Sequence, residues 1–308
     1  MSEINYNEKS VMKKGFPKVK KLGAVSPYGE TTPFVWNGKL MRTEMLYIEG
    51  ENRGECHGVG IRDVETGEII SSVGEDSHFH SAYVEDGTAY IRGVDNSERG
   101  TIRVYESRDL IHWTNRALLS NPGWVYYNTA LTKGPDGYVL LMEAGSPQEH
   151  VGVGFTFFFA TSPDLIHWTF MDYDRGFSKE RYNGGPWMKY SEGYYYVISV
   201  TLLPCDRFTN YIFRTRDFID WEVGAYNPLL MPDEDDRLIS PRAVDMDEAF
   251  LESMKTAFIS SDSDIDMCDY NGKTYICYNV GNQLGTTGWL AEAEYDGTVA
   301  EFLKANFE

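Results

Sequence analysis

A short apolar run, a turn that ends in glycine, and a second run of tyrosine and aliphatic residues recur together along this chain. The turn glycines are Gly38, Gly87, Gly137, Gly193 and Gly272, and Asn or Asp precedes four of them. Asn-Gly and Asp-Gly supply the positive φ angles that two-residue hairpin turns require, so the pattern predicts five β-hairpins. The glycines lie 49, 50, 56 and 79 residues apart, and this spacing indicates a structural repeat.

Five hairpins at a pitch near fifty residues are typical of a β-propeller, whose four-stranded blades take roughly 40 to 50 residues each. We therefore expect an all-β chain that forms one domain, a single five-bladed β-propeller. Its blades are expected near residues 22–75, 76–122, 123–175, 176–232 and 261–305. The long last interval holds an insertion, in which Ser240-Pro241 and the apolar positions that follow predict a short helix near residues 241–257.

A second repeat lies between the hairpins. Asp109–Trp113 and Asp164–Trp168 both read Asp-Leu-Ile-His-Trp, and Asp217–Trp221 reads Asp-Phe-Ile-Asp-Trp, each with Ser or Thr two residues before the Asp. Three near copies cannot all lie at one active site, so we interpret them as packing motifs in which the Asp caps a turn and the Trp fills the gap between blades. His112 and His167 are therefore expected to be structural.

Charge and composition limit the expected binding partners and the expected cellular location of the protein. The chain has 28 basic and 47 acidic residues, a formal net charge of −19, so nucleic acid and anionic membrane surfaces would repel it. It has no apolar run of about 18 residues that would span a membrane, and residues 1–21 lack the apolar core of a signal peptide. Its four cysteines lack Cys-x-x-Cys spacing, which favours reduced thiols in a cytoplasmic protein.

The Ser/Thr-x-Asp-Leu-x-x-Trp repeat, together with hairpins such as residues 191–196, resembles the five-bladed propeller glycoside hydrolases of families 32, 43, 62, 68, 117 and 130. The resemblance covers roughly residues 22–305. It implies a funnel along the propeller axis, lined by the starts of the innermost strands, in which an acid and a base flank a glycosidic bond. The chain departs from family 43, because Thr32-Pro33 replaces the Asp-Pro of its base and Gly184-Gly185-Pro186 replaces the Glu-Gly-Pro of its acid.

Candidate catalytic residues must therefore come from the chain's own funnel segments. Side chains alternate along a strand, so Asp262, Asp264 and Asp266 are expected to share one face. Asp266 also lies six residues before Gly272, the register of the missing family 43 base on another blade. We therefore expect Asp264 or Asp266 to act as base or nucleophile.

Two glutamates extend the candidate set. Glu44 and Glu143 each follow a turn glycine by six residues and end a strand that is otherwise largely apolar. An unpaired charge in a core is costly, so acids at these two positions indicate a polar pocket. We expect Glu143 to be the general acid, with Glu44 as an alternative. A salt bridge with Arg42 is the other interpretation of Glu44.

Polar and aromatic residues near the inner strands are candidates for substrate binding: Glu30, His78, His80, Asn128, Trp124 and Trp187. Glu30 and His80 are also alternates for catalysis. No metal or other cofactor is expected. A divalent cation near Asp262, Asp264 and Asp266, or near His78 and His80, is the less favoured alternative, since the aspartates lack EF-hand spacing.

These features, with the resemblance, predict a glycosidase that acts from the end of a short oligosaccharide, by acid/base catalysis between two carboxyl groups. Inversion is the commoner outcome that the resemblance implies. Two alternatives remain: a sugar phosphorylase similar to family 130, for which Arg42, Arg92, Arg181 and Arg242 are possible phosphate ligands, and a carbohydrate-binding propeller without catalysis.

Overall fold

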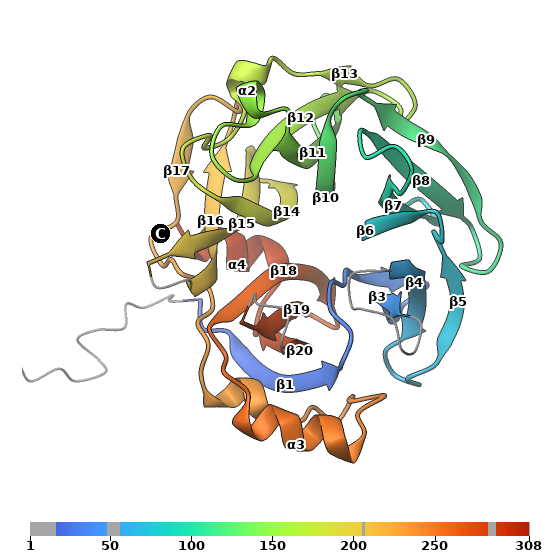
Figure 1. Cartoon of the computed structure of the whole chain (residues 1–308), viewed down its shortest axis with the longest axis vertical. Coiled ribbons are helices and arrows are strands. Elements are labelled where there is room, and N and C mark those ends of the chain that lie inside the picture. Colours follow the sequence, from blue (N-terminus) through green and yellow to red (C-terminus); the bar gives the residue numbers. More distant parts are fainter. Residues whose placement is uncertain (1–16, 48–55, 205–206, 283–287, 308) are drawn as a thin grey trace, which may run out of the picture.

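A computed structural model describes residues 17–47, 56–204, 207–282 and 288–307 of the chain. Its strands form antiparallel groups of four that surround a common centre (Figure 1). Group 1 contains β2 (Pro33–Trp36), β3 (Lys39–Tyr47), β4 (Cys56–Asp63) and β5 (Ile69–Val73), and group 2 contains β6 (Ser77–Glu85), β7 (Thr88–Asp95), β8 (Thr101–Ser107) and β9 (Thr114–Ser120). Group 3 contains β10 (Val125–Gly134), β11 (Gly137–Ser146), β12 (Thr156–Ser162) and β13 (Thr169–Phe170).

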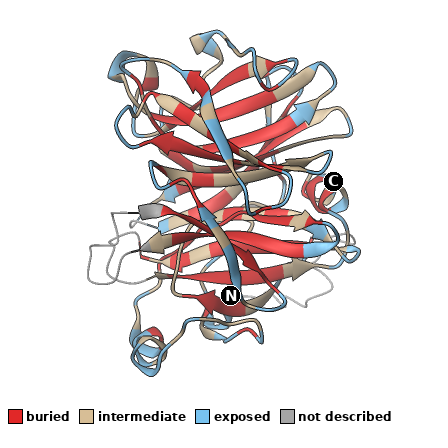
Figure 2. Cartoon of the chain, turned by 90° about the vertical axis from the view of Figure 1, so that its right-hand side faces the viewer, coloured by how far each residue is buried: buried red, intermediate tan, exposed pale blue. Residues whose placement is uncertain are grey.

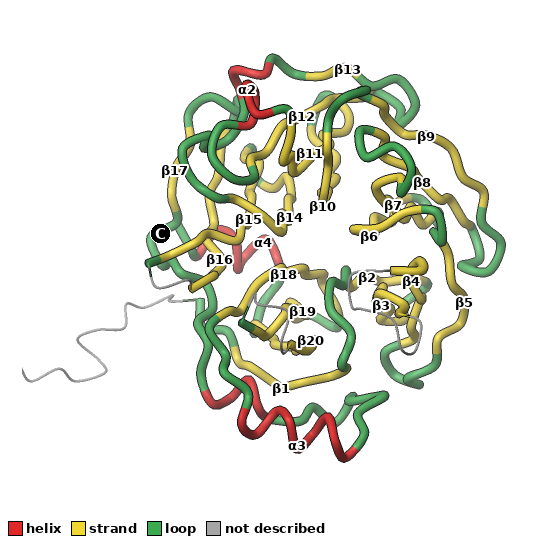
Figure 3. Tube along the Cα trace, in the orientation of Figure 1, coloured by secondary structure: helices red, strands yellow, loops and turns green. Residues whose placement is uncertain are grey.

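The remaining strands form one path of eight, which consists of two antiparallel groups joined by a single parallel bridge between Phe208 and Ser261. Group 4 contains β14 (Asn183–Ser191), β15 (Tyr194–Leu203), β16 (Arg207–Thr215) and β17 (Trp221–Val223), and group 5 contains β18 (Ser261–Tyr270), β19 (Lys273–Gly281), β20 (Gly288–Tyr295) and β1 (Lys20–Ser26). The first strand of each of groups 1 to 4, together with β18, lies nearest the centre (Figure 3). These inner strands contact one another in the cyclic order β2, β6, β10, β14, β18 and back to β2.

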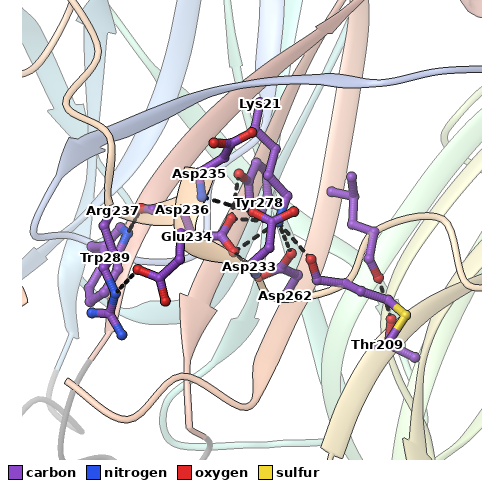
Figure 4. A network of polar contacts seen from close by, with 12 residues as sticks. Lys21, Thr209, Asp233, Glu234, Asp235, Asp236, Arg237, Asp262, Tyr278 and Trp289 are labelled. Atoms are coloured by element: carbon purple, nitrogen blue, oxygen red, sulfur yellow. Dashed lines mark hydrogen bonds and ion pairs between the residues drawn. The ribbon is translucent and has the colours of Figure 1, made fainter. Parts of the chain in front are cut away.

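The amino-terminal strand joins the last group, not the first. We expected blade 1 to begin near residue 22, but β1 pairs with β20 across the register from Lys20–Glu294 to Ser26–Leu290. A buried ion cluster holds β1 in place (Figure 4). The Lys21 ammonium lies 2.8 Å from carboxylate oxygens of Asp236 and Asp262.

All five predicted hairpins are present, and every turn glycine has a positive φ. In four hairpins the glycine is the second turn residue. In β10–β11 the turn is one residue earlier, because Gly134 pairs with Gly137 and the turn residues are Pro135 and Asp136. Gly137 therefore already belongs to the returning strand. This shift by one residue matters for the site below.

Buried residues are concentrated along the strands (Figure 2). Their apolar side chains pack between neighbouring groups, so the buried core lies in the layers between the sheets. Five clusters join groups 1 and 2, 2 and 3, 3 and 4, 4 and 5, and finally 5 and 1. Trp124 lies in the cluster between groups 2 and 3 and stacks on His150. Trp187 lies in the cluster between groups 4 and 5.

The second repeat has the structural role that its sequence predicts. The Asp109 carboxylate accepts hydrogen bonds from the backbone N–H groups of Ile111 and His112, and Asp164 and Asp217 do the same in their copies. Side-chain acceptors of this kind satisfy the free N–H groups of a tight turn. The histidine side chains are 87% and 80% exposed, which agrees with a structural interpretation.

The insertion contains a shorter helix than expected. The segment after Ser240 does not continue as a helix, because Asp245 has a positive φ of 57° that breaks the right-handed path. Helix α3 (Glu248–Thr256) begins instead after Asp247, whose side chain accepts from the N–H of Phe250. The other helical segments are α2 (Gln148–Val151), η1 (Tyr173–Arg175), η2 (Glu234–Arg237) and α4 (Val299–Ala305). Within the described residues, every helix is too short or too polar to cross a membrane.

Candidate active site

The inner strands carry a bulge at one equivalent level. Counting six residues back from the last residue before each hairpin turn gives Glu30, Phe79, Asn128, Gly185 and Asp264. Four of these have a positive φ, between 44° and 57°, and the pairing register shifts at this point in groups 2 to 5. Bulges re-aim side chains that would otherwise alternate regularly, and here they direct polar groups of different blades toward one place.

Three carboxyl groups meet at this level. Glu30 and Asp264 line a cavity of about 30 Å³ together with Asn128. Glu143 reaches the same place from β11, where its Oε2 accepts hydrogen bonds from Asn128 Nδ2 at 3.3 Å and from the N–H of Gly185 at 3.0 Å. The N–H of Gly185 is available because this residue is a bulge, and a Cβ at Gly185 would overlap a carboxylate oxygen of Asp264.

Burial and mutual repulsion keep protons on this cluster. Burial and the neighbouring Asp264 raise the pKa of Glu143 to about 8, and the same two causes raise the pKa of Glu30 to about 8. Burial also raises the pKa of Asp264, but side-chain hydrogen bonds from Ser263 and Asn279 stabilise its anion. The cluster therefore holds a proton donor beside a second carboxyl group whose anion receives hydrogen bonds, which is the equipment of general acid/base chemistry.

Asp266 lies next to this cluster. It lines the same small cavity, and its Oδ2 accepts from the Thr32 hydroxyl at 2.8 Å. Burial raises its pKa to about 8, although Thr32 and the nearby Arg92 favour the charged form. The structure thus brings together Asp264, Asp266, Glu143, Glu30 and Asn128, as the sequence predicts.

Asp262 does not share their face. The bulge at Asp264 shifts the register of β18 between Ser263 and Asp266, so the strict alternation that we assumed fails there. Asp262 instead contacts Lys21, and burial raises its pKa to about 7 against the effect of that ammonium. The expected common face of the three aspartates is therefore wrong.

Glu44 also lies elsewhere. Arg42 Nε and Arg62 Nε donate to its two carboxylate oxygens at 2.5 and 2.7 Å, and the side chain is fully buried. Glu44 and Glu143 both lie six residues after a turn glycine, which made them look equivalent. The two positions differ, because the turn before Gly137 comes one residue earlier than the turn at Gly38. Counted from the strand pairs, Met45 is equivalent to Glu143, and Glu44 faces group 5. The salt-bridge interpretation of Glu44 fits this placement.

The two candidate histidines separate at the bulge of β6. His80 lines the small cavity and is 5% exposed, with Nε2 lying 2.9 Å from the Ser77 hydroxyl. Burial lowers its pKa to about 4, so the ring is neutral at pH 7. His78 packs edge-on against Phe79 outside that cavity, and burial followed by Arg99 lowers its pKa. Within the described residues, no group of three or more His, Cys, Asp or Glu side chains is arranged to hold a metal ion.

The two candidate tryptophans lie away from the small cavity. Trp124 is buried between groups 2 and 3, and Trp187 lines a different, larger cavity farther along the axis. Two residues that sequence reasoning missed take their place. Tyr182 has its pKa raised by burial and then by Glu143, which places it beside the carboxyl cluster. The Asn279 Oδ1 accepts from the N–H of Glu30 at 3.1 Å.

A signal for Asn279 was present in the sequence. It lies six residues after the first residue of β19, just as Glu143 lies six residues after the first residue of β11. Counting from the strand starts, rather than from the glycines, would have paired these two positions. Tyr182 precedes β14 in a loop, and nothing in its sequence surroundings marks it.

No family model and no curated protein sequence matches this chain, whereas solved structures do. A thermostable family-43 glycoside hydrolase is 12% identical, with 90% of this chain and 91% of that one covered and a TM-score of 0.58. A family 32 β-fructofuranosidase from Bombyx mori is 12% identical, with 94% of this chain and 64% of that one covered and a TM-score of 0.57. An α-L-arabinofuranosidase from Podospora anserina in complex with cellotriose is 8% identical over 92% and 99% of the chains, with a TM-score of 0.57.

These structural neighbours are glycoside hydrolases. This chain shares their propeller fold. The resemblance inferred from the two sequence repeats is thus confirmed at the level of the fold. Because one fold serves many reactions, the activity must be argued from the glycoside hydrolase-like fold and the carboxyl cluster together.

Proposed function

We propose that this protein is a glycoside hydrolase in which the five strand groups are the blades of a five-bladed propeller. The observation that carries the proposal is the meeting of Glu143, Glu30 and Asp264 at the bulged starts of the inner strands. Glu143 is buried and Glu30 and Asp264 are partly buried, and among the described residues none of the three has a cation to neutralise it. Such a cluster would be a costly way to stabilise a core. Perturbed carboxyl groups of this kind are concentrated at sites that transfer protons.

We assign Glu143 as the general acid and Asp264 as the general base. Glu143 keeps its proton near pH 7 and can give it to the oxygen of the leaving sugar. The hydrogen bonds from Asn279 and Ser263 favour the anion of Asp264. The cavity beside Asp264 has about 30 Å³, enough for one water but far too small for a sugar ring. A water held next to the base supports the inverting outcome.

The substrate class that suits this site is a short oligosaccharide attacked from its end. Asn128 donates to Glu143 and lines the small cavity, so it can orient the acid and contact a sugar hydroxyl. Tyr182 adds an aromatic ring beside the carboxyl cluster, and aromatic faces commonly stack on sugar rings. Asp266 and His80 also line the small cavity.

The assignment is tested with Glu143→Gln and Asp264→Asn on natural oligosaccharides and on dinitrophenyl glycosides. A dinitrophenolate leaves without protonation, so Glu143→Gln should retain activity on the activated substrates while it loses natural oligosaccharides about a hundredfold or more. Asp264→Asn should lose both. Glu222→Gln, an exposed carboxylate paired with Arg214 on β16, is the matched control and should behave as wild type. Full turnover of oligosaccharides by both site variants would refute the assignment.

Two further measurements separate the alternatives. Proton NMR of the first-formed anomer distinguishes inversion from retention, and release of single sugars from a labelled chain end tests exo action. Activity that requires phosphate and yields a sugar phosphate would identify a phosphorylase. Calorimetric sugar binding with no product over hours would identify a carbohydrate-binding propeller instead.

A further inference from the structure

A second, larger cavity lies along the axis beyond the carboxyl cluster. It has a volume of about 280 Å³ and is lined by the inner strands of all five groups. Ser81, Thr129 and Asp266 belong to the walls of both cavities. The proposed hydrolysis gives this larger cavity no role.

Arg92 on β7 is the distinctive residue of the larger cavity. Its side chain lines the cavity, and the residue is only 1% exposed. One nitrogen, Nη2, donates to the Ser81 hydroxyl at 2.8 Å. Nε and Nη1 are buried and have no hydrogen-bond partner. Among the described residues, Arg92 forms no ion pair with a carboxylate within 4.0 Å, although Asp266 is near enough to act on it electrostatically.

The Arg92 guanidinium lacks hydrogen-bond acceptors and a negative charge to balance its own. Burial lowers the pKa of Arg92 to about 10, while Asp266 opposes that effect, so the guanidinium is charged at neutral pH. Nε and Nη1 together carry three N–H donors without an acceptor. Water can accept these hydrogen bonds but cannot balance the charge, and an uncompensated buried charge is strongly unfavourable.

The size and the charged groups of the cavity limit which ligand can bind Arg92. Its volume lies at the low end of the roughly 300 to 1,000 Å³ that is usual for sites of organic ligands. It is large enough for a small ion with several waters, at about 30 Å³ for each water. Its only other cationic side chain in the described walls, Lys189, is 41% exposed and lies 4.0 Å from Asp269. Asp266, whose pKa is raised to about 8, carries little charge at pH 7 and would not repel an anion.

We propose that this axial cavity binds a small inorganic anion, chloride or an oxyanion such as sulfate or phosphate, with Arg92 as its main ligand. The Thr129 hydroxyl lies in the same wall and can donate a further hydrogen bond, whereas the Ser81 hydroxyl donates to the Thr129 backbone carbonyl at 2.8 Å. The planar fork of arginine suits an oxyanion, and its charge suits a halide. The site is distinct from the carboxyl cluster and does not depend on the proposed hydrolase activity.

Crystals soaked in sodium bromide provide the direct test. The expected result is an anomalous bromide peak next to Nε or Nη1 of Arg92. In solution, thermal unfolding is measured in sodium chloride, sulfate and phosphate, with gluconate keeping the ionic strength constant. The midpoint should rise with the logarithm of the concentration of the bound anion, and the salt with the stronger effect identifies the preferred anion.

Two variants connect the effect to this residue. Arg92→Met should weaken the anion response at least tenfold, whereas Arg216→Met, at an exposed arginine directly after β16, should leave it unchanged. If Arg92→Met does not fold, Arg92→Lys, which keeps the charge and loses the fork, should weaken the response to sulfate and phosphate more than the response to chloride. Absence of a bromide peak in the cavity, or an equal salt response in wild type and the Arg92 variant, would overturn the proposal.

Discussion

Replacing Glu143 by glutamine should remove the proposed acid and also make the protein more resistant to unfolding at alkaline pH. Burial and Asp264 raise the pKa of Glu143 from 4.5 to about 8. A carboxyl with a raised folded pKa contributes stability that is complete below its unfolded pKa and is lost as the pH rises to the folded value, since the folded state holds the proton more tightly. Between pH 5 and pH 8 this loss is about 1.4 kcal/mol per pH unit, or about 4 kcal/mol in total.

The measurement is urea unfolding at pH 5, 7 and 9, followed by tryptophan fluorescence. The free energy of unfolding of Glu143→Gln minus that of wild type should become more positive by about 4 kcal/mol from pH 5 to pH 9. The hydrogen bonds from Asn128 and Gly185 contribute to both pH values alike, because the amide oxygen of glutamine still accepts. Glu222→Gln should differ from wild type by a constant amount. A difference for Glu143→Gln that stays within about 1 kcal/mol over this range would refute the burial argument.

Three other outcomes follow from the same structure. Gly185→Ala should reduce turnover about a hundredfold, because its Cβ would overlap the carboxylate of Asp264, whereas Gly193→Ala, also at positive φ but in open space, should keep wild-type kinetics. Lys21→Met leaves buried carboxylates without their cation and should cost about 3–5 kcal/mol in urea unfolding, whereas Lys20→Met at an exposed site should cost less than about 0.5 kcal/mol. The pH profile of kcat/KM should fall above about pH 8, as the proposed acid loses its proton.

The residues of the turns explain why the fold could be predicted from the sequence. Asn-Gly and Asp-Gly pairs determine three of the five hairpins through backbone angles that few other residues adopt, so these hairpins could be located without knowledge of the rest of the chain. The partner of the amino-terminal strand could not be found in this way. No local signal connects Lys20 with Glu294, and only the packed sheet shows that they pair.

The arrangement of the site was harder to predict, because it depends on single-residue shifts in strand register. A strand changes face with each residue, so the bulge at Asp264 separates Asp262 from its expected companions. The early turn before Gly137 likewise removes the apparent equivalence of Glu44 and Glu143. Neither shift alters the hydrophobic pattern. Composition and spacing therefore predicted most of the carboxyl groups that meet in the structure, but they could not show that Asp262 and Glu44 lie apart from them.

The pairing of β1 with β20 has a consequence for how the chain folds. Lys20 and Glu294 are 274 residues apart, so closing this pair costs about 2 kcal/mol more chain entropy than closing a hairpin of twenty residues. On a ribosome, β1 would emerge long before its partner exists. We therefore expect this seam to form late and to be the slow, high-contact-order step. A circular permutant that joins the two termini, so that β1 follows α4, should bring this pair much closer in sequence and fold faster.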